Sequence, residues 1–345
     1  MNSLNHADAT SSQQPSFMAK PYGEAFLAYA RDNMSVVCVT NDLTASCEAD
    51  MFRDTYPERY FSLGMAEQNL IGVAAGLARE GLIPFYPTFG VFATRRPYEQ
   101  IALSVAYPAL PVRIIGFLPG LTTPGGVTHQ SIDDIALMRT LPNMTVLEVG
   151  DAIEAATVLD VIDAVSGPVY CRMLRGQVPV LFGEPMQLNT ARVLSEGDDV
   201  LILTSGVCTE IALPVVGSLR DAGVSVGHLH ISTLKPFTDS LVLEKLASTR
   251  HILTVENHLV SGGLGTAVSE MMTEHGLGGR LLRIGVNNTF THGGTRDYLF
   301  DYYGLGADGV LAGVERLLDR QFGLDRTESN PRTIEHHRAD VAEGL

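Results

Sequence analysis

The side chains whose types and spacing best suit catalysis are those of Glu67, Phe89, Phe92 and His129. Glu67 opens an otherwise apolar segment of helical periodicity, Phe89 and Phe92 are spaced as i and i+3 after a strand-like run, and His129 follows a glycine-rich loop. Carboxyl and imidazole groups are common proton carriers in enzymes. Each residue also has a structural interpretation: a carboxylate favoured at a helix N-terminus, two aromatic rings of a core, and a histidine that only orders its loop.

These residues fall within an alternation of strands and helices. Strand-like runs rich in β-branched residues cover 36–40, 83–86, 112–116, 145–149 and 169–173. Helical periodicity covers 67–79, 98–106 and 151–165. A second alternation predicts strands at 200–204, 224–229, 251–255 and 281–286, and helices from 210, near 240, after 263 and over 307–318. Because alternating strands and helices form βα units, we predict an α/β fold with mostly parallel sheets.

The alternation divides into two domains. Prolines and a lapse of periodicity predict a linker over 179–192, between a first domain over 18–178 and a smaller second domain over 193–322. Polar composition predicts a disordered arm over 1–17 and a polar tail over 323–345.

Composition and charge limit the possible functions. The 345 residues include 24 Lys and Arg against 39 Asp and Glu, a formal net charge of −15 at pH 7. Such a chain is unsuited to a nucleic-acid surface or a polybasic membrane patch. The longest compact apolar run, 71–78, is too short for a membrane span, and the N-terminus lacks the pattern of a signal peptide. Four scattered cysteines suit a reducing compartment. We therefore expect a cytoplasmic enzyme.

An ordered set of motifs resembles the pyrimidine-binding and C-terminal halves of transketolase and of deoxyxylulose-phosphate synthase. The resemblance is closest to the separately encoded C-terminal subunits of split transketolases. The matching motifs are Asn41-Asp-Leu-Thr-Ala-Ser46, Gly64-Met-Ala-Glu-Gln-Asn69, Thr88-Phe89, Thr128-His-Gln130, Leu141-Pro-Asn-Met144, Pro168-Val-Tyr170, Phe290-Thr-His-Gly-Gly294 and Tyr302-Tyr-Gly-Leu305. The resemblance implies a parallel-sheet pyrimidine-binding domain for thiamine diphosphate, followed by a smaller mixed-sheet transketolase C-terminal domain.

The resemblance implies roles in binding thiamine diphosphate, a cofactor that supplies a carbon nucleophile. Glu67 matches the glutamate that hydrogen-bonds N1′ of the aminopyrimidine and thereby promotes loss of the thiazolium C2 proton. Phe89 and Phe92 would stack on the pyrimidine face. Asp42 would help to hold the cofactor from the subunit interface. A carboxyl group with the role of Glu67 needs a dry pocket.

The resemblance also implies substrate-binding residues. His129 matches a histidine near the substrate hydroxyl, while Arg175 and Ser46 match contacts to a substrate phosphate. Two positions depart: Phe117 stands where the family often has a phosphate-contacting histidine, and Gly125 stands where it has an aspartate that contacts a donor hydroxyl. Losing both polar groups removes hydrogen bonds that discriminate between substrates. We therefore expect transfer of a two-carbon ketol unit, or of an acyl unit, between non-standard small-molecule substrates.

The family's diphosphate and metal site has no counterpart in the sequence. In the family, Gly-Asp-Gly followed by Asn-Asn holds Mg²⁺ and the diphosphate. Here Gly150-Asp-Ala and Gly197-Asp-Asp lack a correctly spaced partner, and Asn287-Asn288 lies in the second domain. Because Mg²⁺ is bound by carboxylate and amide oxygens together with phosphates, we infer a separate N-terminal, diphosphate-binding subunit. The resemblance implies an α₂β₂ assembly with the cofactor between subunits.

Two other interpretations remain open. The chain could be the β-type subunit of a 2-oxo acid decarboxylating or acyl-transferring thiamine-diphosphate enzyme, although Thr128-His129-Gln130 favours transketolase. It could also be a non-catalytic scaffold subunit, although Glu67 and His129 are both present. We expect Gly262-Gly-Leu-Gly265 to begin a helix rather than to bind phosphate, because the rest of a dinucleotide-binding motif is missing.

Overall fold

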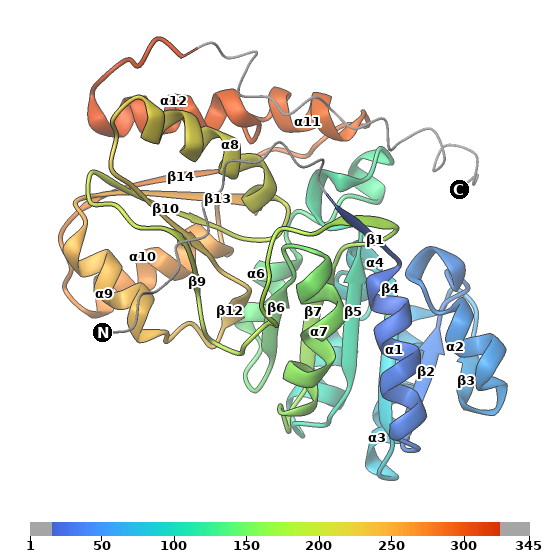
Figure 1. Cartoon of the computed structure of the whole chain (residues 1–345). Helices are drawn as coiled ribbons and strands as arrows, with labels where there is room; N and C mark the ends of the chain where they lie inside the picture. The colour runs from blue at the N-terminus through green and yellow to red at the C-terminus, as the bar shows by residue number, and fades with distance from the viewer. Residues whose placement is uncertain (1–15, 325–345) are drawn as a thin grey trace, which may run out of the picture.

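The computed structural model describes residues 16–324 and contains two α/β domains (Figure 1). The first sheet has the strand order β12 (Thr233–Lys235), β6 (Thr145–Glu148), β7 (Val169–Met173), β5 (Arg113–Phe117), β4 (Ile83–Phe89), β2 (Val36–Thr40) and β3 (Tyr60–Ser62). The second has the order β14 (Arg280–Val286), β13 (His251–Leu259), β10 (Val200–Thr204), β11 (Val226–His230) and β9 (Arg192–Ser195). Only β12 and β9 run antiparallel to their neighbours in these two sheets. The expected fold class is therefore confirmed. Most of the expected arm over 1–17 and of the expected tail over 323–345 lies outside the described residues.

The first sheet is buried on both faces. Successive side chains alternate between two cores, as the pleat requires. Val39 and Tyr86 belong to one core, whereas Cys38 and Phe85 belong to the other. Both faces must therefore be covered by helices.

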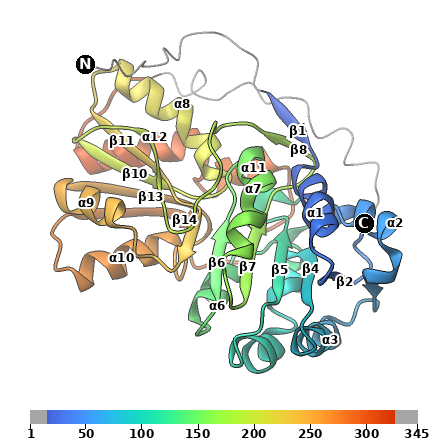
Figure 2. The ribbon, with the colours of Figure 1, turned by 60° about the horizontal axis from the view of Figure 1, so that its bottom comes forward.

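Helices cover each face. The helical segments of this domain are α1 (Pro21–Asp32), α2 (Asp50–Thr55), α3 (Glu67–Arg79), α4 (Gly90–Thr94), α5 (Tyr98–Gln100), the π-helix Ile101–Ala106, α6 (Asp134–Thr140) and α7 (Ala152–Asp163). Apolar residues of α1 and α7 share one core, and those of α3, the π-helix and α6 share the other. Figure 2 shows α1 beside α7 on one side of the sheet. The helix predicted over 67–79 is confirmed as α3.

The second domain repeats this layered arrangement on a smaller sheet. Its helices are α8 (Cys208–Asp221), α9 (Ser240–Ser248), α10 (Leu264–Glu274), α11 (Arg296–Tyr302) and α12 (Ala307–Leu318). The expected helix start after Gly263 is confirmed. The amides of Leu264 and Gly265 donate to the buried carboxylate of Glu256 at 2.7 and 3.0 Å.

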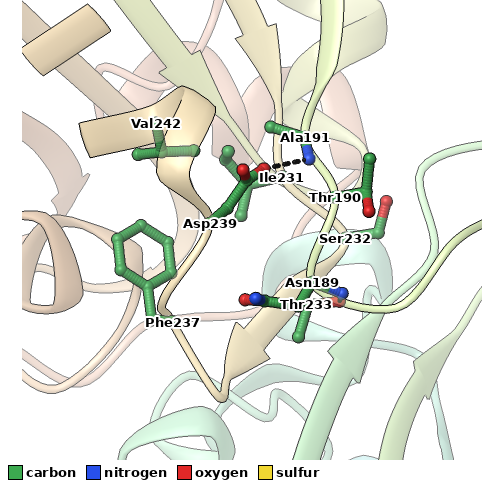
Figure 3. Close-up of a pocket in the computed structure, with 9 residues that line it drawn as sticks. All are labelled: Asn189, Thr190, Ala191, Ile231, Ser232, Thr233, Phe237, Asp239 and Val242. Carbon is green, nitrogen blue, oxygen red and sulfur yellow. Dashed lines mark hydrogen bonds between the residues drawn. The ribbon is translucent and has the colours of Figure 1, made fainter. Parts of the chain in front are cut away.

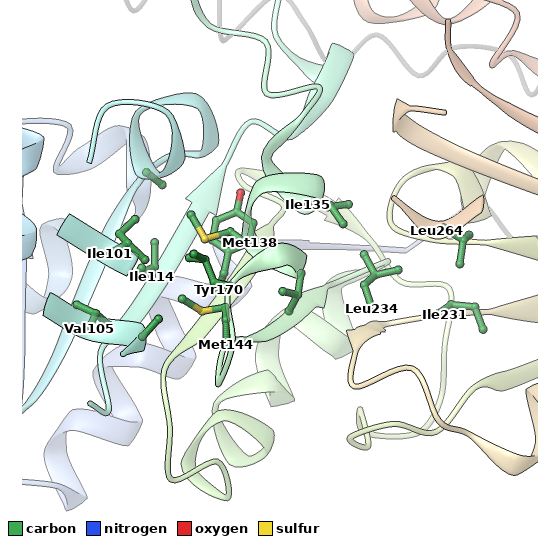
Figure 4. Packing of buried hydrophobic residues seen from close by; sticks show 14 of the residues in the cluster. Ile101, Val105, Ile114, Ile135, Met138, Met144, Tyr170, Ile231, Leu234 and Leu264 are labelled. Carbon is green, nitrogen blue, oxygen red and sulfur yellow. The ribbon is translucent and has the colours of Figure 1, made fainter. Parts of the chain in front are cut away.

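One hydrophobic core continues from the first domain into the second. It joins Ile101 and Met138 of the first domain to Ile231, Leu234 and Leu264 of the second (Figure 4). The second domain also supplies β12, which pairs antiparallel with β6 and extends the first sheet. The two domains therefore share a hydrophobic core and an edge of the first sheet.

A buried ion cluster crosses the same interface. Arg172 on β7 is fully buried and donates to Asp134 and to Glu148 Oε1, the latter at 2.9 Å. It also donates to the backbone oxygen of Asn257 on β13 at 3.0 Å. Burial alone would raise the pKa of Asp134, but the Arg172 guanidinium outweighs this and lowers it. Removing the guanidinium would leave two buried carboxylates unpaired.

A second buried polar chain links α7 to β10 and β11. Glu154 Oε2 lies 3.0 Å from His230 Nε2, and His230 Nδ1 lies 2.6 Å from Thr209 Oγ1. Thr209 contacts Thr204 Oγ1 at 2.7 Å, which lies 2.9 Å from Nε2 of His228. Burial lowers the pKa of His228 to about 3. Burial opposes ionisation of Glu154, but its bonds to His230 and nearby groups lower its pKa to about 2.

A short strand pairing precedes the segment between the domains. β1 (Phe17–Ala19) pairs antiparallel with β8 (Gln177–Pro179), so Phe17 lies in a strand. Between Pro179 and the start of β9 at Arg192 the chain has no regular secondary structure. The sequence pattern did not predict β1, β8 or β12, since strands of three residues have too few positions to show a period.

Candidate active site

The sequence-predicted site residues follow the carboxyl ends of the first sheet's parallel strands. Asp42 follows β2, Glu67 follows β3, Phe89 ends β4, His129 follows β5 and Arg175 follows β7. The chain passes from β2 to β3 on one side, then returns to form β4 on the other side of β2. The strand order therefore reverses between β2 and β4. In open α/β sheets, ligands bind outside the carboxyl ends of the strands at such a switch point.

Glu67 is the first residue of α3, and its side chain is only 5% exposed. Its Oε1 accepts from Nδ2 of Asn41 at 3.4 Å, and Oδ1 of Asn41 accepts from Thr88 Oγ1 at 3.0 Å. Nη1 of Arg96 donates to the same Glu67 oxygen at 2.6 Å. Thr88 and Asn41 therefore orient a shielded carboxylate, and Arg96 balances its charge.

Two phenylalanines form an aromatic surface beside this carboxylate. The ring centroids of Phe89 and Phe92 are 6.0 Å apart and their planes differ by 26°. Both residues are nearly buried, at 7% and 6% exposure. The Arg96 guanidinium lies over Phe92, 4.3 Å from its centroid, while bonded to Glu67. A planar group with N–H donors thus fits between the carboxylate and the aromatic surface.

His129 completes the group. Its ring packs edge-on against Phe92, with centroids 5.4 Å apart, and against Phe89 at 6.4 Å. Nδ1 lies 2.8 Å from Thr128 Oγ1. The structure therefore brings together Glu67, the pair Phe89 and Phe92, and His129, which lie in three separate segments of the sequence.

Ser46 and Arg175 form a second group. Nη1 of Arg175 donates to the Ser46 backbone oxygen at 3.2 Å. Glu48 supports both segments, since its carboxylate accepts from the amides of Gly23 and Gly176 at 3.0 and 2.8 Å. Burial raises the pKa of Glu48 despite these bonds. This anchored loop holds Arg175 at the same edge of the sheet as Glu67.

Asp42 takes a backbone conformation that differs from its neighbours. Its φ is +81°, in the left-handed region, and its side chain is exposed. The preceding residue, Asn41, points inward and binds Glu67. Asp42 is therefore placed outside the carboxylate network rather than within it.

Phe117 and Gly125, the two positions at which the sequence differs from the motifs that it resembles, have different surroundings. Phe117 is fully buried at the end of β5 and packs edge-on against Tyr22, with centroids 5.4 Å apart. Its ring therefore belongs to the core. Gly125 lies beside His129: a Cβ added there would lie 2.9 Å from the Cβ and 3.0 Å from the Cγ of that residue. Any side chain at position 125 would displace the imidazole.

Arg96, Asn41 and Thr88 belong to the site, but their roles were not predicted. Arg96 is four residues after Phe92, the spacing at which helical side chains meet, so its contact with the ring had a sequence signal. The contacts of Asn41 with Glu67 and Thr88 join separate strands and depend on the fold.

The pocket of Figure 3 lies elsewhere, between the segment 189–191 and α9. Its volume is about 10 Å³, enough for a single water molecule. The amide of Ala191 donates to Asp239 Oδ2 at 2.6 Å. The side chains of the other polar residues that line the pocket also have hydrogen-bond partners within the protein; these residues are Asn189, Thr190, Ser232 and Thr233. A larger cavity of about 530 Å³ adjoins Arg139 and Lys235 at the domain interface. Neither is lined by the predicted site residues.

The residues fit one part of thiamine diphosphate better than the other. A shielded carboxylate beside an aromatic surface suits an aminopyrimidine ring, which needs a hydrogen bond at its edge and stacking on its face. Within residues 16–324, no three His, Cys, Asp or Glu side chains are grouped as a metal site. In the same range, no helix has the length and apolar character needed to cross a membrane.

Comparisons with known proteins agree with this geometry. The family profile "Transketolase, pyrimidine binding domain" matches residues 16–180, and "Transketolase, C-terminal domain" matches residues 189–310. A transketolase family protein of Sinorhizobium fredii is 38% identical over 318 residues, which are 91% of this chain and 92% of the relative. A 6-deoxy-6-sulfo-D-fructose transketolase subunit of Clostridium sp. is 37% identical, covering 87% of this chain and 94% of the relative. A solved structure described as a split-gene transketolase, inactive β₄ tetramer, aligns with a TM-score of 0.78 and 38% identity, over 87% of this chain and 97% of that chain.

Proposed function

The chain belongs to the transketolase family, and on this basis we propose that it is the C-terminal subunit of a thiamine-diphosphate-dependent enzyme that transfers a two-carbon ketol unit. The donor would be ketose-type and the acceptor an aldehyde. The observation that carries the proposal is the group formed at the switch point of the sheet by Phe89, Phe92 and His129, to which Arg96 links the carboxylate of Glu67.

In this proposal Glu67 holds a proton at N1′ of the cofactor's pyrimidine. Bound thiamine diphosphate would supply the carbon nucleophile that attacks the donor ketose. Asn41 and Thr88 fix the carboxylate orientation, and Phe89 and Phe92 present the ring surface on which the pyrimidine stacks. Burial keeps water from competing for the carboxylate, which strengthens the hydrogen bond that it makes. Arg96 must release Glu67 Oε1 when the pyrimidine binds, because both need the same position.

His129 would exchange a proton with the substrate hydroxyl. Its Nδ1 is engaged by Thr128 Oγ1, which leaves Nε2 for the substrate. Arg175 and the Ser46 segment would bind an anionic group at the far end of the substrate, since a guanidinium can bind an oxyanion with several N–H donors. Asp42, whose side chain is exposed, would contact the cofactor from the subunit interface.

We propose that the usual pentose phosphates are not the best substrates. Gly125 provides no carboxylate for a donor hydroxyl, and Phe117 is a core residue rather than a phosphate ligand. The relative from Clostridium sp., whose name specifies a sulfonated sugar, supports a departure from phosphate sugars.

Steady-state turnover tests this proposal with the partner subunit present. Xylulose 5-phosphate plus ribose 5-phosphate should react poorly compared with other ketose and aldehyde pairs. Full competence on this pair would refute the claim of non-standard substrates. Dependence on a 2-oxo acid with release of CO₂ would instead identify a decarboxylating enzyme and refute ketol transfer.

A partner chain follows from the missing half of the cofactor site. The inferred separate N-terminal subunit would hold the diphosphate and Mg²⁺, giving an α₂β₂ enzyme. The relative described as a split-gene transketolase supports this arrangement, since its β chains alone are described as inactive. The four free thiols, all buried, suit the reducing cytoplasm that we propose as its location.

A further inference from the structure

The loop that carries His129 is bonded to the second domain at two separate points. It connects β5 to α6 and contains two short 3₁₀ turns, Gly120–Thr122 and Gly126–Thr128. A loop of this length has little regular structure of its own, so its shape depends on what it contacts. Its contacts therefore decide where the imidazole lies.

The first point is Asn257 of β13, which is fully buried. Its Oδ1 accepts from the Leu121 amide at 2.8 Å, and its Nδ2 donates to the Pro119 oxygen at 2.9 Å. Gly120 lies between them with φ +52°, and a Cβ there would be 2.2 Å from Asn257 Oδ1. Only glycine allows so close an approach, and the start of the loop is thereby fixed against the second domain.

The second point is Gln130, the residue after His129, which is also fully buried. Its Nε2 donates to the backbone oxygens of Thr123 and His292, each at 3.1 Å, and its Oε1 accepts from Thr291 Oγ1. Both amide hydrogens and the oxygen are therefore used. One of these bonds closes the loop on itself, and the other two tie it to residues 291–292.

Backbone packing strengthens the second point. Gly126, whose φ is +70°, lies against Gly293: a Cβ on Gly126 would be 3.3 Å from the Gly293 nitrogen. A Cβ on Gly293 would in turn be 2.9 Å from the Pro124 oxygen. The His129 amide donates to the Gly126 oxygen at 2.9 Å, so the contact with Gly293 reaches the histidine through one hydrogen bond.

We propose that Thr291 and Asn257 are positioning residues that hold the catalytic imidazole of His129 in place from the second domain. The C-terminal domain thus contributes to the chemistry of the first domain's site as well as to the core. The catalytic role of His129 rests on the proposed function. The clamp, by which we mean the bonds of Asn257 and Gln130 that attach the loop to the second domain, rests on the contacts alone.

The test compares Thr291→Val with Thr291→Ser and Thr295→Val. Valine keeps the shape of threonine but lacks the hydroxyl, and serine restores the hydroxyl. Thr295 is the control because it lies in the same segment, is exposed, and its side chain makes no hydrogen bond that caps α11. Hydrogen–deuterium exchange of peptides covering 118–131 is measured on each full-length chain. We expect T291V to raise exchange there about tenfold or more, because a buried acceptor loses its donor, while T291S and T295V stay near the original chain.

Turnover of the enzyme assembled with its partner gives the second readout. We expect T291V to lower kcat about 10- to 100-fold with little change in cofactor affinity, since misplacement of a reacting group is costly to rate. Unchanged exchange over 118–131 would overturn the clamp whatever the activity. Faster exchange with unchanged kcat would overturn the positioning role.

A second variant and the separate exchange measurement distinguish failure of the clamp from failure of folding or of the proposed function. If T291V does not fold, Asn257→Asp serves instead, because it keeps the acceptor for the Leu121 amide and loses the donor to Pro119. If the original assembled enzyme transfers no ketol unit, the proposed function fails, while the exchange measurement still decides whether the clamp exists.

Discussion

Glu67→Gln separates the chemistry of the site from the stability of the fold. Glutamine keeps the size of the side chain and an oxygen that can accept from Asn41 and Arg96, but it removes the charge. The Arg96 side chain is 48% exposed, so water can compensate the guanidinium when its partner is neutral. Because the charge that remains in E67Q is that of the half-exposed Arg96, we expect the substitution to lower the free energy of unfolding by only about 1 kcal/mol.

The expected loss of activity is much larger. A positioned proton carrier contributes about 10²- to 10⁴-fold to the rate, which is about 3 to 5 kcal/mol in the activation free energy. Glutamine cannot exchange the proton at N1′, so kcat should fall by that factor. The assay is turnover of the assembled enzyme, paired with the thermal unfolding temperature of each chain. Glu80→Gln, at the exposed end of the same helix, is the matched control.

A fall in kcat of less than tenfold in E67Q would refute the assignment of Glu67. Unchanged activity would favour the scaffold interpretation of this subunit. A large fall that accompanies loss of assembly would show that the carboxylate is structural, and in that case E67Q would unfold at a clearly lower temperature than the control.

Three other substitutions test the account. Gly125→Asp should lower kcat at least about tenfold by displacing the His129 ring, and normal turnover would show that the loop adapts. As the pH falls from 6.5 to 3 the chain should lose stability, because His228 is protonated in the unfolded state before it is protonated in the folded state. The free energy of unfolding of His228→Gln, measured with denaturant, should therefore depend less on pH than that of the original chain. An equal dependence on pH would exclude this group. Arg172→Met should lower the free energy of unfolding by about 3–5 kcal/mol, because it leaves the buried carboxylate of Asp134 unpaired. Arg31→Gln removes an exposed ion pair and should change the free energy of unfolding little. Equal effects of the two substitutions would contradict the role of the buried ion cluster.

The sequence predicted the strongly periodic elements well. Strands 36–40, 169–173 and 200–204 and helices 67–79 and 307–318 have the bounds expected from pattern alone. Each has enough apolar positions for its period to be read. β12 was missed because it has three residues and is fixed by pairing with β6, a contact between segments distant in the chain.

The candidate site was predicted in part. Motif order identified Glu67, Phe89, Phe92 and His129. The structure places the two phenylalanines and His129 in contact, and Arg96 links Glu67 to Phe92. The contacts that orient them could not be read from the sequence. Asn41, Arg96 and Thr291 reach the site from different elements, and only the parallel sheet and the domain interface bring them together.

Native mass spectrometry of this chain, tagged and isolated from its own cells, tests whether it shares its cofactor site with a partner subunit. We predict a complex in which this chain is joined by a second protein, with thiamine diphosphate and Mg²⁺ bound. A homo-oligomer of this chain that binds the cofactor without a partner would contradict it, because the diphosphate and metal site would then have to lie within these 345 residues.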